Sequence, residues 1–188
     1  MKKFKFIETK IRDLYIVEPV VLGDARGYFM ETYNKEEFYQ AGLNMDFVQD
    51  NESKSKKGVL RGLHFQTKHA QGKLVRVTEG EVYDVAVDLR KGSPTFGEWE
   101  AVFLNAENKR QFYVPKGFAH GFLVLSEVAT FNYKCTDFYA PEYESGILWN
   151  DEEVGIKWPL DKIGELILSE KDKQQKKLSK LEVPFTYE

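Results

Sequence analysis

Three segments of the chain gather the residue types that can move a proton beside a carbonyl group. They are GVLRGLHFQTKHAQGK, with Arg61, His64 and Lys73; VPKGFAHGF, with His120; and FNYKCTDFYAPEYESG, with Tyr133. An imidazole accepts a proton near neutral pH, whereas a phenol, with a reference pKa of about 10, stays protonated and can donate one. A lysine ammonium can stabilise the negative oxygen that forms in between. These segments therefore indicate acid–base chemistry next to a ketone or a related carbonyl.

The strand pattern decides whether these groups can meet. His64 follows the strand-like run GVLRGL, and Lys73 opens the next run, LVRV, so an antiparallel return would bring both to one barrel mouth. Arg61 has the opposite pleat parity from His64, so either a bulge at Gly62 or a role for Arg61 at the rim is needed to bring both to one ligand. The alternatives are a core or turn histidine and a solvated lysine at a strand end.

The segment Pro115–His120 has the form P-x-G-x-x-H, which resembles the second motif of the cupins. Metal-binding cupins carry H-x-H and a following glutamate in their first motif, whereas this chain has His64-Phe65-Gln66 and no acid before Lys73. Two of the usual four ligands are therefore missing. In addition, the ammonium group of Lys73 would repel a divalent cation at short range. We therefore expect no metal, and His120 is either a core histidine or a substrate contact.

Tyr133 and Asp172 each allow two interpretations. Tyr133 shares its strand parity with Phe131 and Cys135, so it is either a core tyrosine with a satisfied hydroxyl or a phenol that points into a pocket. Asp172, in LSEKD, is either a surface acid or the carboxylate that orients a histidine through its Nδ1–H.

Two polar segments could recognise a nucleotide. The turn DARG carries Arg26, and the strand end QDNE carries Gln49, Asp50 and Asn51. Amide groups recognise pyrimidine edges or sugar hydroxyls, and a guanidinium binds phosphate as a bidentate donor. Ordinary loop polarity is the alternative.

The pattern along the whole chain predicts an all-β protein. Short β-branched and aromatic runs are separated by Gly, Pro or charged turns. They span 14–22, 27–33, 47–52, 59–65, 74–79, 81–89, 99–104, 111–114, 121–125 and 130–136. So many strands suggest a closed barrel or jelly roll, with a tight hairpin turn over 78–81. Only 34–41, capped by Asn34 and stopped near Gly42, predicts an internal helix, and 172–181 predicts a short surface helix or a tail.

Length and composition restrict the class of protein. A chain of 188 residues with 42% hydrophobic content favours one domain. The net charge of -3 and the pI near 5.8 argue against a nucleic-acid partner. Cys135 is the only cysteine, which excludes an internal disulfide and a cysteine zinc site. The start, MKKFKFIETKIRD, has no apolar h-region and no run of ~18 apolar residues occurs, so we expect a soluble, cytoplasmic protein without a membrane partner.

Taken in order, the motifs resemble the dTDP-4-dehydrorhamnose 3,5-epimerase family, metal-free cupins of the dTDP-L-rhamnose pathway. The resemblance runs through DARGYFMETYN, FVQDNES, GVLRGLHFQ, KLVRVTEGEVYDVAVDLRKGSPTFGEW, PKGFAHGFLVLSE, NYKCTDFYAPEYESGILWND, IKWP and LSEKD. It implies a cupin-type jelly-roll barrel with a few short peripheral helices, as a single domain over residues 1–188. It also implies epimerisation of dTDP-4-dehydro-6-deoxy-D-glucose at C3 and C5 to dTDP-4-dehydro-L-rhamnose, without a cofactor.

The resemblance also implies roles for the matching positions. His64 would be the general base, held by Asp172. Tyr133 would be the general acid on the opposite face of the sugar, and Lys73 would stabilise the enolate oxygen. The remaining contacts with the dTDP-sugar would be made by Arg61, His120, Gln49, Asp50, Asn51, Tyr139 (stacked on thymine), Glu144 and Lys171. In the family the N-terminal strand crosses to a partner subunit, so a homodimer would share its sites through Arg26, Phe29 and Glu31.

Two alternatives remain open at this point. One is a related sugar-nucleotide cupin that epimerises C3 only or isomerises the ketone; Tyr133 and the intact NYKCT run favour double epimerisation instead. The other is a non-catalytic cupin that binds a sugar or has a regulatory role. The complete set of base, cation and acid favours an enzyme, because binding alone does not need that combination.

Overall fold

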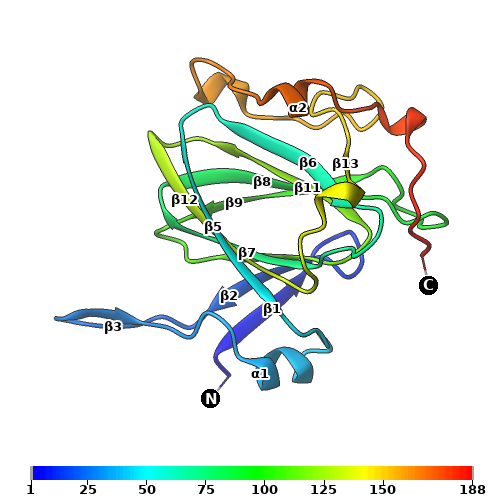
Figure 1. The fold of residues 1–188 in the computed structure, drawn as a ribbon. Coiled ribbons are helices and arrows are strands. Elements are labelled where there is room, and N and C mark those ends of the chain that lie inside the picture. Colours follow the sequence, from blue (N-terminus) through cyan, green and yellow to red (C-terminus); the bar gives the residue numbers. More distant parts are fainter. Residues whose placement is uncertain (1, 188) are drawn as a thin grey trace.

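The computed structural model describes residues 2–187, and two antiparallel sheets face one another across an apolar interior (Figure 1). The six-stranded sheet contains, in spatial order, β1 (Phe4–Glu8), β2 (Tyr15–Pro19), β10 (Gln111–Val114), β7 (Lys73–Glu79), β12 (Val128–Cys135) and β5 (Gln49–Lys56). The five-stranded sheet contains β13 (Glu144–Gly146), β6 (Leu60–Gln66), β11 (Phe118–Val124), β8 (Glu81–Asp88) and β9 (Trp99–Asn105).

Strands that follow one another in sequence often belong to opposite sheets. The chain leaves β6 in one sheet for β7 in the other and then returns to the first sheet with β8. This crossing confirms the predicted all-β jelly roll. Hydrogen bonds do not close the two sheets into a ring, so the molecule is a two-layered sandwich rather than a continuous barrel.

The alternation of β8 explains how the five-stranded sheet is buried on both faces. Val82 and Ala86 point into the core between the sheets, where they join residues of β7, β10, β11 and β12. Tyr83, Val85 and Val87 point to the outer face. The chain after β13 covers that face, so both sets of side chains leave water.

The segment 78–81 is not a hairpin turn, so that prediction is wrong. β7 ends at Glu79 and β8 begins at Glu81, but the two strands belong to different sheets. Gly80 between them has φ +76°, and a Cβ there would lie 2.0 Å from the Val128 carbonyl oxygen. Gly80 therefore turns a corner between the two layers. A glycine between two strand-like runs is compatible with both arrangements, and only the tertiary pairing distinguishes them.

A β-bulge at Gly62 reorients the strand that carries His64. The pairing of β6 with β11 matches His64 to His120 and Arg61 to Phe122, so β6 has one extra residue between these pairs. Gly62 has φ +118°, and a Cβ there would lie 2.6 Å from the backbone of β11. Of the two arrangements that the sequence left open for Arg61 and His64, the structure shows the bulge.

Short helices lie at the edges of the sandwich, as expected. α1 (Lys35–Gln40) begins at Asn34, whose side chain accepts a hydrogen bond from the Glu37 N–H at 3.2 Å, and this confirms the predicted helix. The others are α2 (Glu170–Lys173) and the 3-10 helices η1 (Pro141–Tyr143), η2 (Leu160–Lys162) and η3 (Leu178–Lys180). Within residues 2–187, no helix has the length and apolar character needed to cross a membrane.

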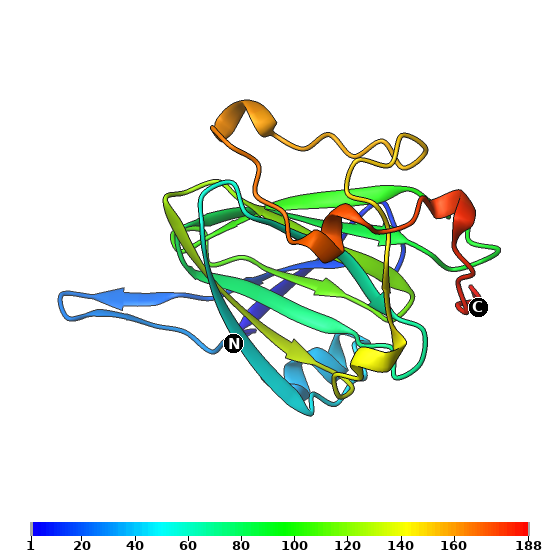
Figure 2. The ribbon, with the colours of Figure 1, turned by 45° about the horizontal axis from the view of Figure 1, so that its top comes forward.

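A hairpin of β3 (Leu22–Asp24) and β4 (Gly27–Phe29) projects away from both sheets as an arm (Figure 2). Its apolar side chains are largely exposed, at 59% for Leu22 and Tyr28 and 65% for Phe29. Apolar groups gathered on a projecting element are typical of an interaction surface.

Candidate active site

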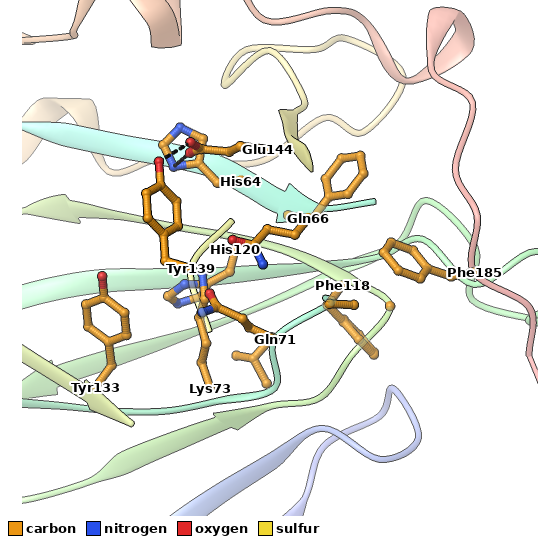
Figure 3. Close-up of a pocket in the computed structure, with 14 residues that line it drawn as sticks. His64, Gln66, Gln71, Lys73, Phe118, His120, Tyr133, Tyr139, Glu144 and Phe185 are labelled. Carbon is orange, nitrogen blue, oxygen red and sulfur yellow. Dashed lines mark hydrogen bonds and ion pairs between the residues drawn. The ribbon is translucent and has the colours of Figure 1, made fainter. Parts of the chain in front are cut away.

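A cavity of about 610 Å³ opens between the sheets, and both sheets contribute to its lining. The five-stranded sheet provides Arg61, His64 and His120, and the six-stranded sheet provides Lys73 and Tyr133. Figure 3 shows Lys73 and Tyr133 pointing into the hollow from the side opposite His64. The five side chains singled out from the sequence therefore meet, although β6 and β7 lie in facing sheets and are not paired with each other.

His64 contacts Asp172, which α2 contributes from the C-terminal part of the chain. The His64 Nε2 lies 2.5 Å from Asp172 Oδ1, and the carboxylate is buried. The sequence suggested a contact at Nδ1; that prediction is wrong, because Asp172 on α2 reaches the ring at Nε2. Nδ1 instead faces Glu144 Oε1 at 3.8 Å. Burial raises the pKa of Asp172, but the hydrogen bonds from His64 and Ser169 outweigh it, so the net pKa lies below the ordinary value.

Glu144 lies between His64 and the mouth of the cavity. Its Oε2 accepts a hydrogen bond from the Tyr139 hydroxyl at 2.6 Å and pairs with Lys171. The hydrogen bond to Glu144 raises the pKa of Tyr139 to about 12. Burial raises the pKa of Glu144, but the hydrogen bonds from Lys171 and Tyr139 lower it by more, so the net pKa is below its usual range. An ionised Glu144 thus holds the two predicted binding residues beside His64.

The Lys73 ammonium lies inside the cavity, with Nζ 5.8 Å from the centre of the Tyr133 ring. Burial lowers the pKa of Lys73, while Cys135, Asp84 and Glu144 act in the opposite direction. Within residues 2–187, Nζ makes neither a hydrogen bond nor an ion pair. A partly buried cation without a fixed counterion is suited to stabilise a negative charge that a ligand develops.

Tyr133 is part of the wall between the core and the cavity. It packs against the buried cluster between the sheets, and its ring lies 5.9 Å from the Phe131 ring. Burial raises the pKa of Tyr133, with a smaller effect of Cys135 in the same direction. The phenol therefore keeps its proton at neutral pH, which is the state that a general acid requires.

His120 forms a buried pair with Asp84, a residue that the sequence analysis did not assign to the site. Nε2 of His120 lies 2.8 Å from Asp84 Oδ1, while Oδ2 has no hydrogen-bond partner in the described part of the chain. Burial raises the pKa of Asp84, and His120 and Lys73 oppose this only in part. The sequence did contain a signal for Asp84, because it alternates with Val82 and Ala86 on the core face of β8. A carboxylate at such a position is costly to bury and therefore suggests a function.

Arg61 is held at the cavity wall by Ser55, another residue that the sequence analysis did not identify. Its Nε and Nη2 donate to Ser55 Oγ at 3.2 and 3.1 Å. Ser55 is buried on β5, so the contact joins the two sheets at the cavity.

The predicted nucleotide contacts on β5 divide between two faces. Gln49 and Asn51 pair across the sheet with Cys135 and Tyr133, so they lie on the cavity side. Gln49 accepts a hydrogen bond from the Tyr139 N–H at 3.0 Å and donates one to Asn51 Oδ1 at 3.1 Å. Asp50 has the opposite parity, is exposed and pairs with Lys134 at 3.0 Å on the outer face. The structure therefore does not bring Asp50 to the cavity of its own chain.

The three residues expected to act in a neighbouring subunit lie away from the cavity of their own chain. Arg26 pairs with Asp24 within the arm, and Phe29 is exposed. Glu31 pairs with Lys3 and accepts a hydrogen bond from Asn34 at 2.9 Å. Their contribution to a partner's site stays a prediction.

Comparison with known proteins links this cavity to one family. The family model described as dTDP-4-dehydrorhamnose 3,5-epimerase matches residues 8–180. A dTDP-4-dehydrorhamnose 3,5-epimerase of Methanothermobacter thermautotrophicus is 58% identical over 178 residues, which is 95% of this chain and 96% of that protein.

Solved structures agree with the sequence comparison. A dTDP-6-deoxy-D-glucose-3,5-epimerase from Legionella pneumophila, in complex with dTDP-4-keto-L-rhamnose, superimposes with a TM-score of 0.94 at 50% identity and covers 98% of this chain and 99% of its own. A 3'-monoepimerase from Streptomyces bikiniensis, in complex with dTDP-quinovose, has a TM-score of 0.85 at 36% identity and covers 92% and 87%. The chain belongs to the dTDP-4-dehydrorhamnose 3,5-epimerase family.

Proposed function

We propose that this chain epimerises dTDP-4-dehydro-6-deoxy-D-glucose at C3 and C5 to give dTDP-4-dehydro-L-rhamnose. One observation carries the proposal: an imidazole and a phenol, His64 and Tyr133, line one cavity from facing sheets, with the Lys73 ammonium in the same space. The names of the relatives and the keto-sugar bound in the Legionella structure support the choice of substrate.

The proton transfers follow from the position of the carbonyl. The 4-keto group acidifies the hydrogens on C3 and C5, and His64 removes one of them as the C–H electron pair moves to the carbonyl oxygen. Tyr133 then donates its proton to the other face of the carbon, and the enolate returns to the ketone. Proton exchange with solvent restores both side chains. Two groups are needed because a single one would return the proton to the original face, and each is typically worth about 10²–10⁴ in rate.

The enolate oxygen is the point where negative charge appears, and Lys73 would stabilise it. A charge positioned beside the developing oxyanion contributes roughly 3–4 kcal/mol to the stabilisation of such a transition state. Burial disfavours the charged form of Lys73, and this supports the role. An ammonium group that has lost part of its hydration is stabilised more strongly when a negative charge forms beside it. His120 and Arg61 would help to hold the substrate near the base.

The mouth of the cavity would hold the nucleotide. Tyr139 is 52% exposed and would stack on thymine, while Gln49 and Asn51 on the cavity face would bind polar edges of the nucleotide. The cationic side chains of Arg61 and Lys171 would bind the diphosphate.

We also propose that the chain is one cupin domain that works as a homodimer with shared sites. The exposed apolar arm supports an exchange in which Arg26, Phe29 and Glu31 enter the partner's cavity. A cytoplasmic location fits a nucleotide-sugar substrate and a lone reduced cysteine, Cys135.

Proton NMR in D₂O with dTDP-4-dehydro-6-deoxy-D-glucose tests the proposed activity. We expect the sugar to exchange the hydrogens at both C3 and C5 and to convert to the L-configured product. Exchange at one carbon would indicate a C3 epimerase or ketoisomerase. The similarity to the Streptomyces 3'-monoepimerase is the reason to test this alternative. Binding without exchange would indicate a sugar-binding cupin.

The His64→Ala variant tests the base in the same assay. It should lose exchange at both carbons, because no other imidazole of the cavity is aimed by a carboxylate of α2. Exchange at the wild-type rate in this variant would rule out His64 as the base, even if the wild-type protein is an epimerase.

A further inference from the structure

The Asp172 carboxylate is held at both of its oxygens. His64 Nε2 lies 2.5 Å from Oδ1, and the Ser169 hydroxyl donates a hydrogen bond to Oδ2 at 2.7 Å. The same hydroxyl oxygen accepts a hydrogen bond from the Asp172 backbone N–H at 3.1 Å. One small side chain thus restrains both the main chain and the carboxylate of the residue that holds His64.

Ser169 is in turn fixed to the strand that carries His64. Two residues earlier, Ile167 runs beside the start of β6: its N–H donates to the Gly58 carbonyl at 2.9 Å, and its carbonyl accepts from the Leu60 N–H at 3.0 Å. Gly58 allows this close approach, because a Cβ there would lie 1.9 Å from a carbonyl oxygen of the adjoining segment. Backbone hydrogen bonds therefore link β6 to the segment that presents Ser169 and Asp172.

We propose that Ser169 is a positioning residue for the proton-transfer step. Its hydroxyl fixes the orientation of the Asp172 carboxylate, and the carboxylate in turn orients His64 toward the cavity. This inference rests on the proposed function. The last torsion of an aspartate side chain has broad, shallow minima, so a carboxylate held at only one oxygen can swing. A second anchor removes that freedom and fixes the imidazole it contacts.

Ser169 also caps a helix, and substitutions at this position can separate that structural role from the proposed one. Ser169 is the N-cap of α2, a position where glycine is tolerated almost as well as serine. Ser169→Gly therefore keeps the helix start but removes the donor to Oδ2. Ser169→Thr keeps a hydroxyl that can both accept and donate.

Steady-state kinetics give the first test. We expect Ser169→Gly to lower kcat on the order of 10- to 100-fold with KM nearly unchanged, because a misaimed base slows chemistry without weakening binding. Ser169→Thr should restore most of the loss. Ser179→Gly, at an exposed serine of η3, is the matched control and should keep wild-type kcat. A rise in KM with unchanged kcat would indicate a substrate contact and overturn the proposal.

Imidazole NMR of the ligand-free protein gives a test that does not depend on turnover. The chain has three histidines, and His120 is paired with Asp84 rather than with α2. Ser169→Gly should shift the ring signals of His64 and leave those of His120 in place. Unchanged His64 signals would overturn the proposal. Wild-type protein that fails to exchange substrate hydrogens would instead refute the proposed function, while this experiment would still decide the link between Ser169 and His64.

Discussion

His120 and Asp84 form a pair that is almost completely removed from water, with 2.8 Å between Nε2 and Oδ1. The second carboxylate oxygen has no partner among residues 2–187, and the nearby Lys73 ammonium is equally without one. Buried charged groups that are incompletely paired reduce stability, and such groups concentrate at functional sites. The cavity wall and the core behind it therefore contain two charged groups, Lys73 and Asp84, whose burial disfavours their charged forms.

The first prediction concerns stability at Asp84. Burial raises its pKa in the folded protein above the unfolded value. The folded state therefore binds the proton more tightly, so the penalty is absent below about pH 3.9, grows as the pH rises toward the folded pKa and then stays constant. Asp84→Asn should raise the Tm at pH 7 by a few degrees, since each ~1 kcal/mol shifts it by roughly 2–4 °C in a domain of this size.

Thermal unfolding at pH 3 and pH 7 checks the Asp84 prediction. The gain should disappear at pH 3, and Asp161→Asn, at an exposed acid of η2, should show no gain at either pH. The turnover of Asp84→Asn should fall, because His120 loses its charged partner. A lower Tm at pH 7 would show that the ionised carboxylate stabilises the fold and would contradict the prediction.

The second prediction separates the two effects of Lys73. Burial lowers its pKa, so the folded protein disfavours the charged form; the resulting penalty is present at neutral pH and vanishes as the pH rises toward ~10.4, the unfolded value. Lys73→Met should raise the Tm at pH 7 while it lowers kcat by about 10²–10³. Lys116→Met, at an exposed lysine, should change neither quantity. Hydrogen exchange at the wild-type rate in Lys73→Met would remove Lys73 from the enolate step.

Local features of this fold were predictable from the sequence because local chemistry determines them. Asn34 caps α1 through its own side chain, and the parity conflict between Arg61 and His64 already indicated a bulge at Gly62 as one of two solutions. The same period-two argument, applied to β5, would have separated Asp50 from its neighbours.

Features that depend on which elements meet were not predictable in this way. Gly80 looks like a hairpin turn until its two strands are assigned to different sheets. Ser169 is an ordinary polar residue until α2 is placed against β6, and the choice of Nε2 over Nδ1 on His64 depends on the side from which Asp172 arrives. The sequence thus pointed to side chains that line one cavity, whereas the residues that hold those side chains in place depend on tertiary pairing.

The third prediction tests the acid. Tyr133→Phe removes the hydroxyl group but keeps the aromatic ring that packs against the core, so the fold should be retained. Deprotonation by His64 should continue, and solvent deuterium should still enter the sugar, whereas inversion should fall by about 10²–10⁴. Proton NMR in D₂O measures both quantities in one sample. Equal loss of deuterium entry and inversion would count against Tyr133 as the acid, and Tyr39→Phe, at an exposed tyrosine of α1, serves as the control.

The fourth prediction tests the shared site of the proposed homodimer. If Arg26 acts in the partner's cavity, Arg26→Ala and His64→Ala chains should each be inactive, yet a mixed dimer would contain one complete site. Random exchange in an equal mixture makes half of the dimers mixed, so the mixture should regain about a quarter of wild-type activity. His64→Ala mixed with Tyr133→Phe should regain none, because both residues line the cavity of their own chain. Absence of recovery after verified subunit exchange would show that the arm does not complete the neighbouring site, and Arg26 would then have to act within its own chain or not at all.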